Sequence, residues 1–164
     1  MCLAMTACEQ GPIRSESFRD LELGEKADRP DEFQLTRASV ALQKKYPKHD
    51  RGCLDLHYTR KHDSLSIKGI KLEAIVYQFH QGKLSRVFMA CGMKDRLCAK
   101  QLYELALSLL GKPALDQSKK DFWWASWDFA DGVNIKVQTG SLTITQLGLL
   151  SEKLKHCRRK IIFH

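Results

Sequence analysis

Residues 70–113 constrain the fold most, because they predict a β-hairpin that leads into an amphipathic helix. Residues 72–79 and 84–91 are apolar runs rich in β-branched and aromatic side chains, and Gly82 between them can adopt the positive φ of a tight turn. Both faces of these two strands are largely apolar. A sheet with two apolar faces needs other elements to cover it, so we expect helices packed over the sheet.

The helix after this hairpin has a clear start and stop. Asp95 can cap its N-terminus, and Gly111 followed by Pro113 is a C-terminal stop signal. Helical spacing places five apolar residues on one stripe, which we expect to face the sheet: Cys98, Leu102, Leu105, Ala106 and Leu109.

A second helix is predicted upstream. Asp31 and Gln34 have the spacing of a capping box, and Phe33 and Val40 lie on one helical stripe behind it. The residue before a proline avoids the helical conformation, so this helix should end before Pro47.

Alternating apolar and polar residues predict several short strands, and Asp131-Gly132 predicts a type I′-like hairpin turn. The simplest interpretation of residues 147–160 is a C-terminal helix, with Leu150 and Leu154 facing inward. The chain is thus expected to be an α+β protein with a mainly antiparallel sheet and helices packed over it, in a single domain of residues 18–164. The further strands are expected at 18–24, 53–58, 64–67, 121–130, 133–139 and 142–145.

The N-terminus predicts a location. Residues 3–8 resemble the end of a bacterial lipoprotein signal peptide, in which small residues such as Thr6 and Ala7 precede a cysteine that is diacylated. Met5 departs from this pattern, which prefers leucine. The resemblance implies that residues 1–7 are a residual signal segment, that Cys8 is the lipidation site, and that residues 8–17 are a flexible tether. The alternative is a frayed N-terminus with incidental cysteines.

The order of elements resembles a largely uncharacterised group of small secreted bacterial domains. The resemblance consists of the segments at 18–24, 79–84, 111–113 and 124–137. Such domains usually serve as binding or assembly modules, so the resemblance implies a non-enzymatic role.

Four of the six cysteines lie beyond the N-terminal segment, and an even number of cysteines suits an oxidising compartment. They allow three pairings. We prefer Cys91 with Cys98, because a strand end and the first turn of the next helix can meet, which leaves Cys53 with Cys157. The alternative is four buried free thiols in a cytosolic protein.

Metal and catalytic sites are not expected. His49, His57 and His62 lie near Asp50 and Cys53, but their spacing matches no zinc motif. A nucleophile elbow, a phosphate-binding loop and a dinucleotide fingerprint are also missing from the sequence. We therefore expect no metal, no cofactor and no enzyme activity. A small hydrolase is the third candidate function, after the two binding functions described next.

Binding candidates come from aromatic residues and cations. The formal net charge is +8, from 27 Lys and Arg against 19 Asp and Glu, which suits an anionic partner. The preferred function is a membrane-tethered periplasmic lipoprotein that binds an envelope protein or an anionic membrane surface. The rival is a cytosolic nucleic-acid-binding domain. The candidate binding residues are Trp123, Trp124, Trp127, Lys44, Lys45, Arg51, Arg158 and Arg159.

Overall fold

The computed structural model describes residues 17–18, 21–27, 29–48, 50–120 and 122–161. Three α-helices and two 3-10 helices alternate with short strands in this part of the chain. In chain order the elements are β1 (Ser17–Phe18), β2 (Leu21–Glu22), η1 (Pro30–Glu32), β3 (Phe33–Leu35), α1 (Arg37–Lys45), η2 (Arg51–Cys53), β4 (Tyr58–Arg60), β5 (Ser66–Ile67), β6 (Ile70–Lys71), β7 (Ala74–His80), β8 (Lys83–Ala90), α2 (Arg96–Leu110), β9 (Leu115–Asp116), β10 (Trp124–Asp128), β11 (Val133–Gln138), β12 (Ser141–Gln146) and α3 (Leu147–Ile161).

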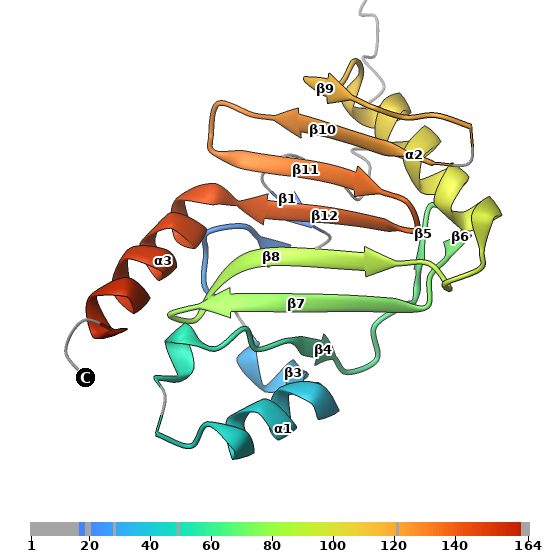
Figure 1. Cartoon of the computed structure of the whole chain (residues 1–164). Coiled ribbons are helices and arrows are strands. Elements are labelled where there is room, and N and C mark those ends of the chain that lie inside the picture. The colour runs from blue at the N-terminus through green and yellow to red at the C-terminus, as the bar shows by residue number, and fades with distance from the viewer. Residues whose placement is uncertain (1–16, 19–20, 28, 49, 121, 162–164) are drawn as a thin grey trace, which may run out of the picture.

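The described strands form one antiparallel sheet of eight strands and two small two-stranded sheets. The strand order of the large sheet is β3-β4-β7-β8-β12-β11-β10-β9. Figure 1 shows α1 beside the β3 edge, α2 near the β9 and β10 side, and α3 at the end of the sheet where β12 leaves it. The α+β class with helices packed over an antiparallel sheet is therefore confirmed.

The predicted central hairpin is the β7–β8 pair. Gln81 and Gly82 both have positive φ, at 52° and 79°, as a two-residue type I′ turn requires. The register pairs Ile75 with Met89 and Tyr77 with Val87. All four of these side chains are buried, so the hairpin lies at the centre of the core.

Helix α2 covers the face of the sheet that carries this core. Asp95 caps the helix as predicted, since its Oδ1 accepts a hydrogen bond of 2.9 Å from the backbone N–H of Cys98. Gly111 ends it at a φ of 73°. Cys98, Leu102 and Ala106 are buried against the sheet, whereas Leu109 is exposed. The cap, the stop and most of the stripe were therefore predicted correctly, but the expectation that Leu109 faces the sheet is wrong because its side chain is exposed.

The predicted capping box at Asp31 is wrong. Residues 30–32 form a 3-10 turn, Phe33 lies in an edge strand, and α1 begins only after Thr36, whose side chain accepts from Ser39 N–H. The Phe33 ring packs edge-on against Tyr77 and Phe79, with centroid distances of 5.2 and 4.9 Å. Burial against β7 thus holds Phe33 in the sheet. The predicted end of the helix before Pro47 is confirmed.

Two predicted strands are displaced. Cys53 ends the 3-10 turn η2, where the Asp50 side chain accepts a hydrogen bond from Gly52 N–H, so the strand expected at 53–58 starts only at Tyr58. The strand expected at 18–24 is instead a pair of two-residue strands, β1 and β2. At Cys53, the side-chain cap overrides the alternating pattern.

The C-terminal third follows the predicted order with two corrections. The β10–β11 turn is closed by a hydrogen bond of 3.0 Å from Gly132 N–H to Phe129 O, and Gly132 but not Asp131 has positive φ, so it is not type I′. In α3, Leu149 is buried and Leu154 is 51 % exposed, so Leu154 does not face inward. The helix begins directly after β12, and its first two turns are the part that reaches the sheet.

Candidate binding site

Two disulfides are present in the preferred pairing, one local and one long-range in the sequence. Cys91 is bonded to Cys98, seven residues away, with a Cα–Cα distance of 5.8 Å. Cys53 is bonded to Cys157, 104 residues away, with a Cα–Cα distance of 5.5 Å. The sequence-based pairing is therefore confirmed. The first bond reinforces the core between β8 and α2, and the second joins η2 to α3.

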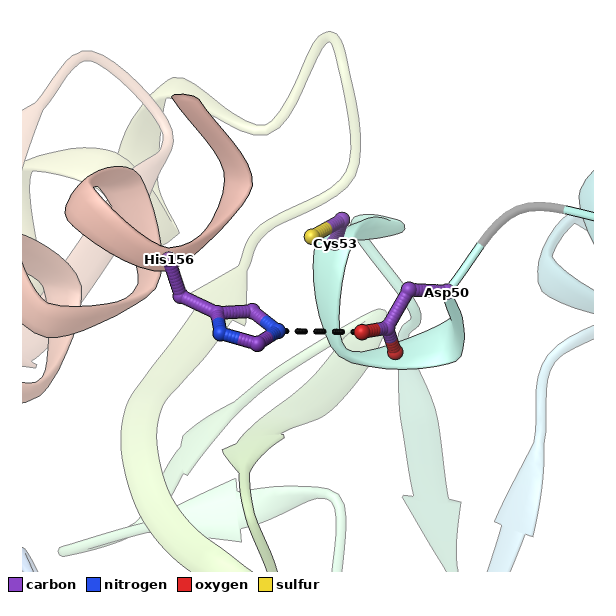
Figure 2. Close-up of side chains that lie close together, drawn as sticks. All are labelled: Asp50, Cys53 and His156. Carbon is purple, nitrogen blue, oxygen red and sulfur yellow. Dashed lines mark hydrogen bonds and ion pairs between the residues drawn. The ribbon is translucent and has the colours of Figure 1, made fainter. Parts of the chain in front are cut away.

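The junction between η2 and α3 also contains a histidine–aspartate hydrogen bond and an ion pair. His156 Nε2 lies 3.0 Å from Asp50 Oδ2 (Figure 2). One turn earlier, Lys153 Nζ lies 2.7 Å from Asp55 Oδ1 and donates to Leu54 O at 3.1 Å. The hydrogen bond from Lys153 holds the pKa of Asp55 below its usual value, although partial burial opposes this shift. Charge, hydrogen bonding and a covalent bond thus fix α3 on η2.

This junction joins two segments that carry cations and lie far apart in the sequence. Lys44 and Lys45 are the last residues of α1, and Arg51 belongs to η2. Exposed Lys155 belongs to α3, two residues before the disulfide-bonded Cys157. We call this surface the basic corner. Its exposed cations are Lys44, Lys45, Lys48, Arg51 and Lys155.

Two cations that follow η2 in the sequence have structural partners. Arg60 Nη2 lies 2.7 Å from Glu32 Oε2, and Lys61 Nζ donates to Asp31 O at 2.9 Å. Arg158 and Arg159 lie within α3, but their side chains are outside the described residues. Of the predicted basic residues, Lys44, Lys45 and Arg51 are therefore the ones that the structure places on a shared exposed surface.

A shallow groove runs between α1 and η2 within the basic corner. Its volume is about 340 Å³. Val40 and Tyr46 are 38 % and 36 % exposed in it, and the Lys45 ammonium lies 5.2 Å from the centre of the Tyr46 ring. The groove therefore has an apolar floor and a cationic rim. Its lining consists of Val40, Gln43, Lys44, Tyr46, Pro47, Arg51 and Leu54.

The three tryptophans do not form one site. Trp127 is 3 % exposed in the core, and its indole N–H donates to Gly111 O at 3.0 Å. Trp123 is partly buried against the same core. Trp124 alternates to the opposite face of β10, where Lys136 Nζ lies 5.0 Å from its ring. Most of the aromatic cluster therefore serves packing. Strand β10, which carries Trp124, lies on the opposite side of the sheet from β3 and α1 (Figure 1).

A buried histidine lies beneath α3. His80 is 2 % exposed, and neither ring nitrogen has a hydrogen-bond partner among the described residues. It borders a small cavity that Lys153, Arg86 and Thr145 also line. Burial lowers the pKa of His80, and the positive charge of Lys153 lowers it further. His80 is therefore kept neutral by its position under the helix.

The structure does not assemble the histidines that the sequence places near Cys53. His57 lies in a loop, where its backbone N–H donates to Ser39 Oγ at 2.7 Å, and His62 lies in a turn at a φ of 57°. His49 and Cys8 lie outside the described residues. His156 takes the place beside Asp50 and Cys53 instead. Its position next to Cys157, the partner of Cys53, was the available signal in the sequence.

The described chain is a single α+β domain with two internal disulfides. Comparisons with protein-family models, with curated proteins and with solved structures each returned no match. In the described part of the chain, the helices are too short or too polar to span a bilayer.

Proposed function

We propose that this chain is a lipid-anchored binding module of the bacterial envelope, in which the basic corner docks on an anionic membrane surface. The observation that carries the proposal is the Cys53–Cys157 disulfide, because it joins α3 to η2, the element that follows α1 in the chain, and all three elements carry exposed cations. Two disulfides suit an oxidising compartment such as the periplasm. The net charge of +8 favours an anionic partner, such as an anionic membrane surface.

The anchor and the basic corner would have separate roles. A diacylated Cys8 would hold the domain at the membrane, and the residues from 8 to 17 could span at most about 35 Å. Tethering makes docking an intramolecular event, so a weak surface affinity suffices to orient the domain. Each lysine or arginine near an anionic leaflet contributes about 1 kcal/mol. The five cations of the basic corner are enough for such an interaction.

The groove adds an apolar component to this surface. Tyr46 offers an amphipathic ring next to cations, the combination that suits the boundary between headgroups and acyl chains. An acidic amphipathic segment of an envelope protein has the same chemistry and is the second candidate partner. The nucleic-acid rival relies on tryptophans that stack bases beside the cations, and Trp124 lies apart from the basic corner, which leaves Tyr46 as the aromatic residue of the groove that could stack a base.

Vesicle binding tests the docking role. The chain with Cys8→Ser, which carries no anchor, is sedimented with anionic phosphatidylglycerol vesicles and with neutral phosphatidylcholine vesicles. Lys44→Gln, Lys45→Gln and Arg51→Gln together remove about 3 kcal/mol, so affinity for anionic vesicles should fall about a hundredfold. A control with Lys94→Gln, Lys112→Gln and Lys119→Gln removes the same charge elsewhere. An equal loss in the control would refute docking through the basic corner.

Intact mass tests the anchor. In membranes of the native host, the proposal requires a form that begins at Cys8, carries acyl mass and contains both disulfides. A soluble form that begins at Met1, with free thiols, would overturn the envelope assignment and bring nucleic-acid binding to the front.

A further inference from the structure

We infer that reduction of the Cys53–Cys157 disulfide turns the η2–α3 junction into a zinc site made of Asp50, Cys53, His156 and Cys157. This inference concerns the reduced protein and does not depend on membrane docking. It assigns a second state to the junction, in which a metal ion replaces a covalent bond between the same two elements.

The ligand atoms are already together in the oxidised protein. The ligand atoms of Asp50, Cys53 and His156 all lie within 4.8 Å of one another (Figure 2). The Cys157 sulfur is bonded to that of Cys53, so it lies beside the same cluster. Zinc–sulfur bonds of about 2.3 Å and zinc–nitrogen or zinc–oxygen bonds of about 2.0 Å allow an ion to sit among four such donors after small side-chain rotations.

The local geometry favours metal binding. Asp50 and Cys53 lie three residues apart on one tight turn, and His156 and Cys157 are adjacent on α3. Gly52 N–H donates to Asp50 Oδ1 at 2.9 Å, which orients the carboxylate and leaves Oδ2 toward His156. A Cβ atom at position 52 would lie only 3.3 Å from Oδ1. Outer hydrogen bonds of this kind orient metal ligands.

The chemistry makes the site depend on redox state. A disulfide sulfur carries no ligand charge, whereas a thiolate is a strong zinc ligand. A dithiol reductant transfers two electrons and two protons to the Cys53–Cys157 bond, giving two thiols, and is itself oxidised to a disulfide. Zinc binding then releases the two thiol protons. Two thiolates, one imidazole and one carboxylate suit zinc better than magnesium or calcium.

Cobalt titration of the reduced protein tests the site. The full chain with Cys2→Ser and Cys8→Ser is reduced with dithiothreitol, freed of reductant under argon and titrated with Co²⁺, then with Zn²⁺. We expect one Co²⁺ per chain, tetrahedral visible bands, sulfur-to-cobalt charge transfer and displacement by Zn²⁺. The oxidised protein should show none of these bands.

Variants identify the ligands. Cys53→Ser with Cys157→Ser should abolish the charge-transfer band, whereas Cys91→Ser with Cys98→Ser should retain it. His156→Ala and Asp50→Ala should each weaken the affinity for Co²⁺ at least about tenfold. Substitution of residues that only hydrogen-bond to a metal ligand already lowers metal affinity by that much. His57→Ala is the matched control for His156→Ala and should leave the affinity unchanged.

Folding is followed by circular dichroism in the same samples. If the reduced apo-protein unfolds, Zn²⁺ should restore the native spectrum, because binding energy becomes folding energy at such a site. Cobalt bands that depend on Cys91 and Cys98, or a reduced protein that neither binds nor refolds with metal, would overturn the inference.

Discussion

The two disulfides hold regions of opposite kinds. Cys91–Cys98 spans seven residues, and both cysteines are buried between β8 and α2. Cys53–Cys157 spans 104 residues and joins half-buried elements at the periphery. The first bond reinforces a contact that the neighbouring strand, cap and apolar stripe already specify. The second joins two elements that are far apart in the sequence, and it holds α3, which carries Lys155, against η2, which carries Arg51.

Removal of the long-range bond is expected to have the largest effect. In the chain-entropy treatment, a loop of about 100 residues corresponds to about 4.7 kcal/mol. Cys53→Ala with Cys157→Ala should therefore lower the free energy of unfolding by about 4–5 kcal/mol in urea titrations followed by circular dichroism. Mass spectrometry confirms that the other bond is intact. If this variant lost less unfolding free energy than the variant without Cys91–Cys98, the expected order of the two effects would be wrong.

The local bond should matter less for stability. Cys91→Ala with Cys98→Ala opens a loop of seven residues, for which the same treatment gives about 2–3 kcal/mol. Binding to anionic vesicles should be unchanged, because the basic corner is retained. Loss of vesicle binding in this variant would show that the two regions are coupled.

The cap next to the local bond provides a finer test. Asp95→Ala removes the acceptor for Cys98 N–H and should cost about 1 kcal/mol of unfolding free energy. Asp95→Ser restores an N-cap acceptor and should recover most of that loss. Equal losses in both variants, measured by urea denaturation, would rule out capping as the cause.

The pH dependence tests the region under α3. The pKa of His80 is lowered in the folded state, so the unfolded chain binds the proton first. Stability should be fully present above about pH 6.5, the ordinary histidine value, and should decline as the pH falls below it. His80→Leu should flatten this decline, measured as urea midpoints from pH 8 to pH 5.

His57→Gln is the matched control for His80→Leu, because the His57 side chain is exposed. Lys153, Glu152, His156 and Asp50 all influence His80, so the comparison uses the difference between the variant and the parent. An unchanged slope in His80→Leu would exclude His80 as its source.

The predictable parts of the fold are those set by neighbours in the sequence. The β7–β8 turn follows from Gly82, and α2 follows from Asp95, an apolar stripe and Gly111. The start of α1 was not predictable in this way. Phe33 packs on Tyr77 and Phe79, more than 40 residues later, and this contact draws it into the sheet.

The candidate site shows the same limit. The sequence identified Lys44, Lys45 and Arg51 as basic and proposed the cysteine pairing, but only the folded chain shows that this pairing joins η2, which carries Arg51, to α3. His156 was missed because no spacing rule links it to Asp50, which lies 106 residues earlier. The three tryptophans were predicted to be binding candidates, but Trp123 and Trp127 pack against the core.

The length of the loop closed by Cys53–Cys157 also sets when the basic corner can exist. Cys157 follows Cys53 by 104 residues, which takes roughly 5–20 s to synthesise at about 5–20 residues per second. Strands β4 to β12 emerge during that interval and can pair before the last helix arrives. The cation-rich surface is thus completed last, after the sheet has been made, so an unfinished chain carries the cations of α1 without their final arrangement.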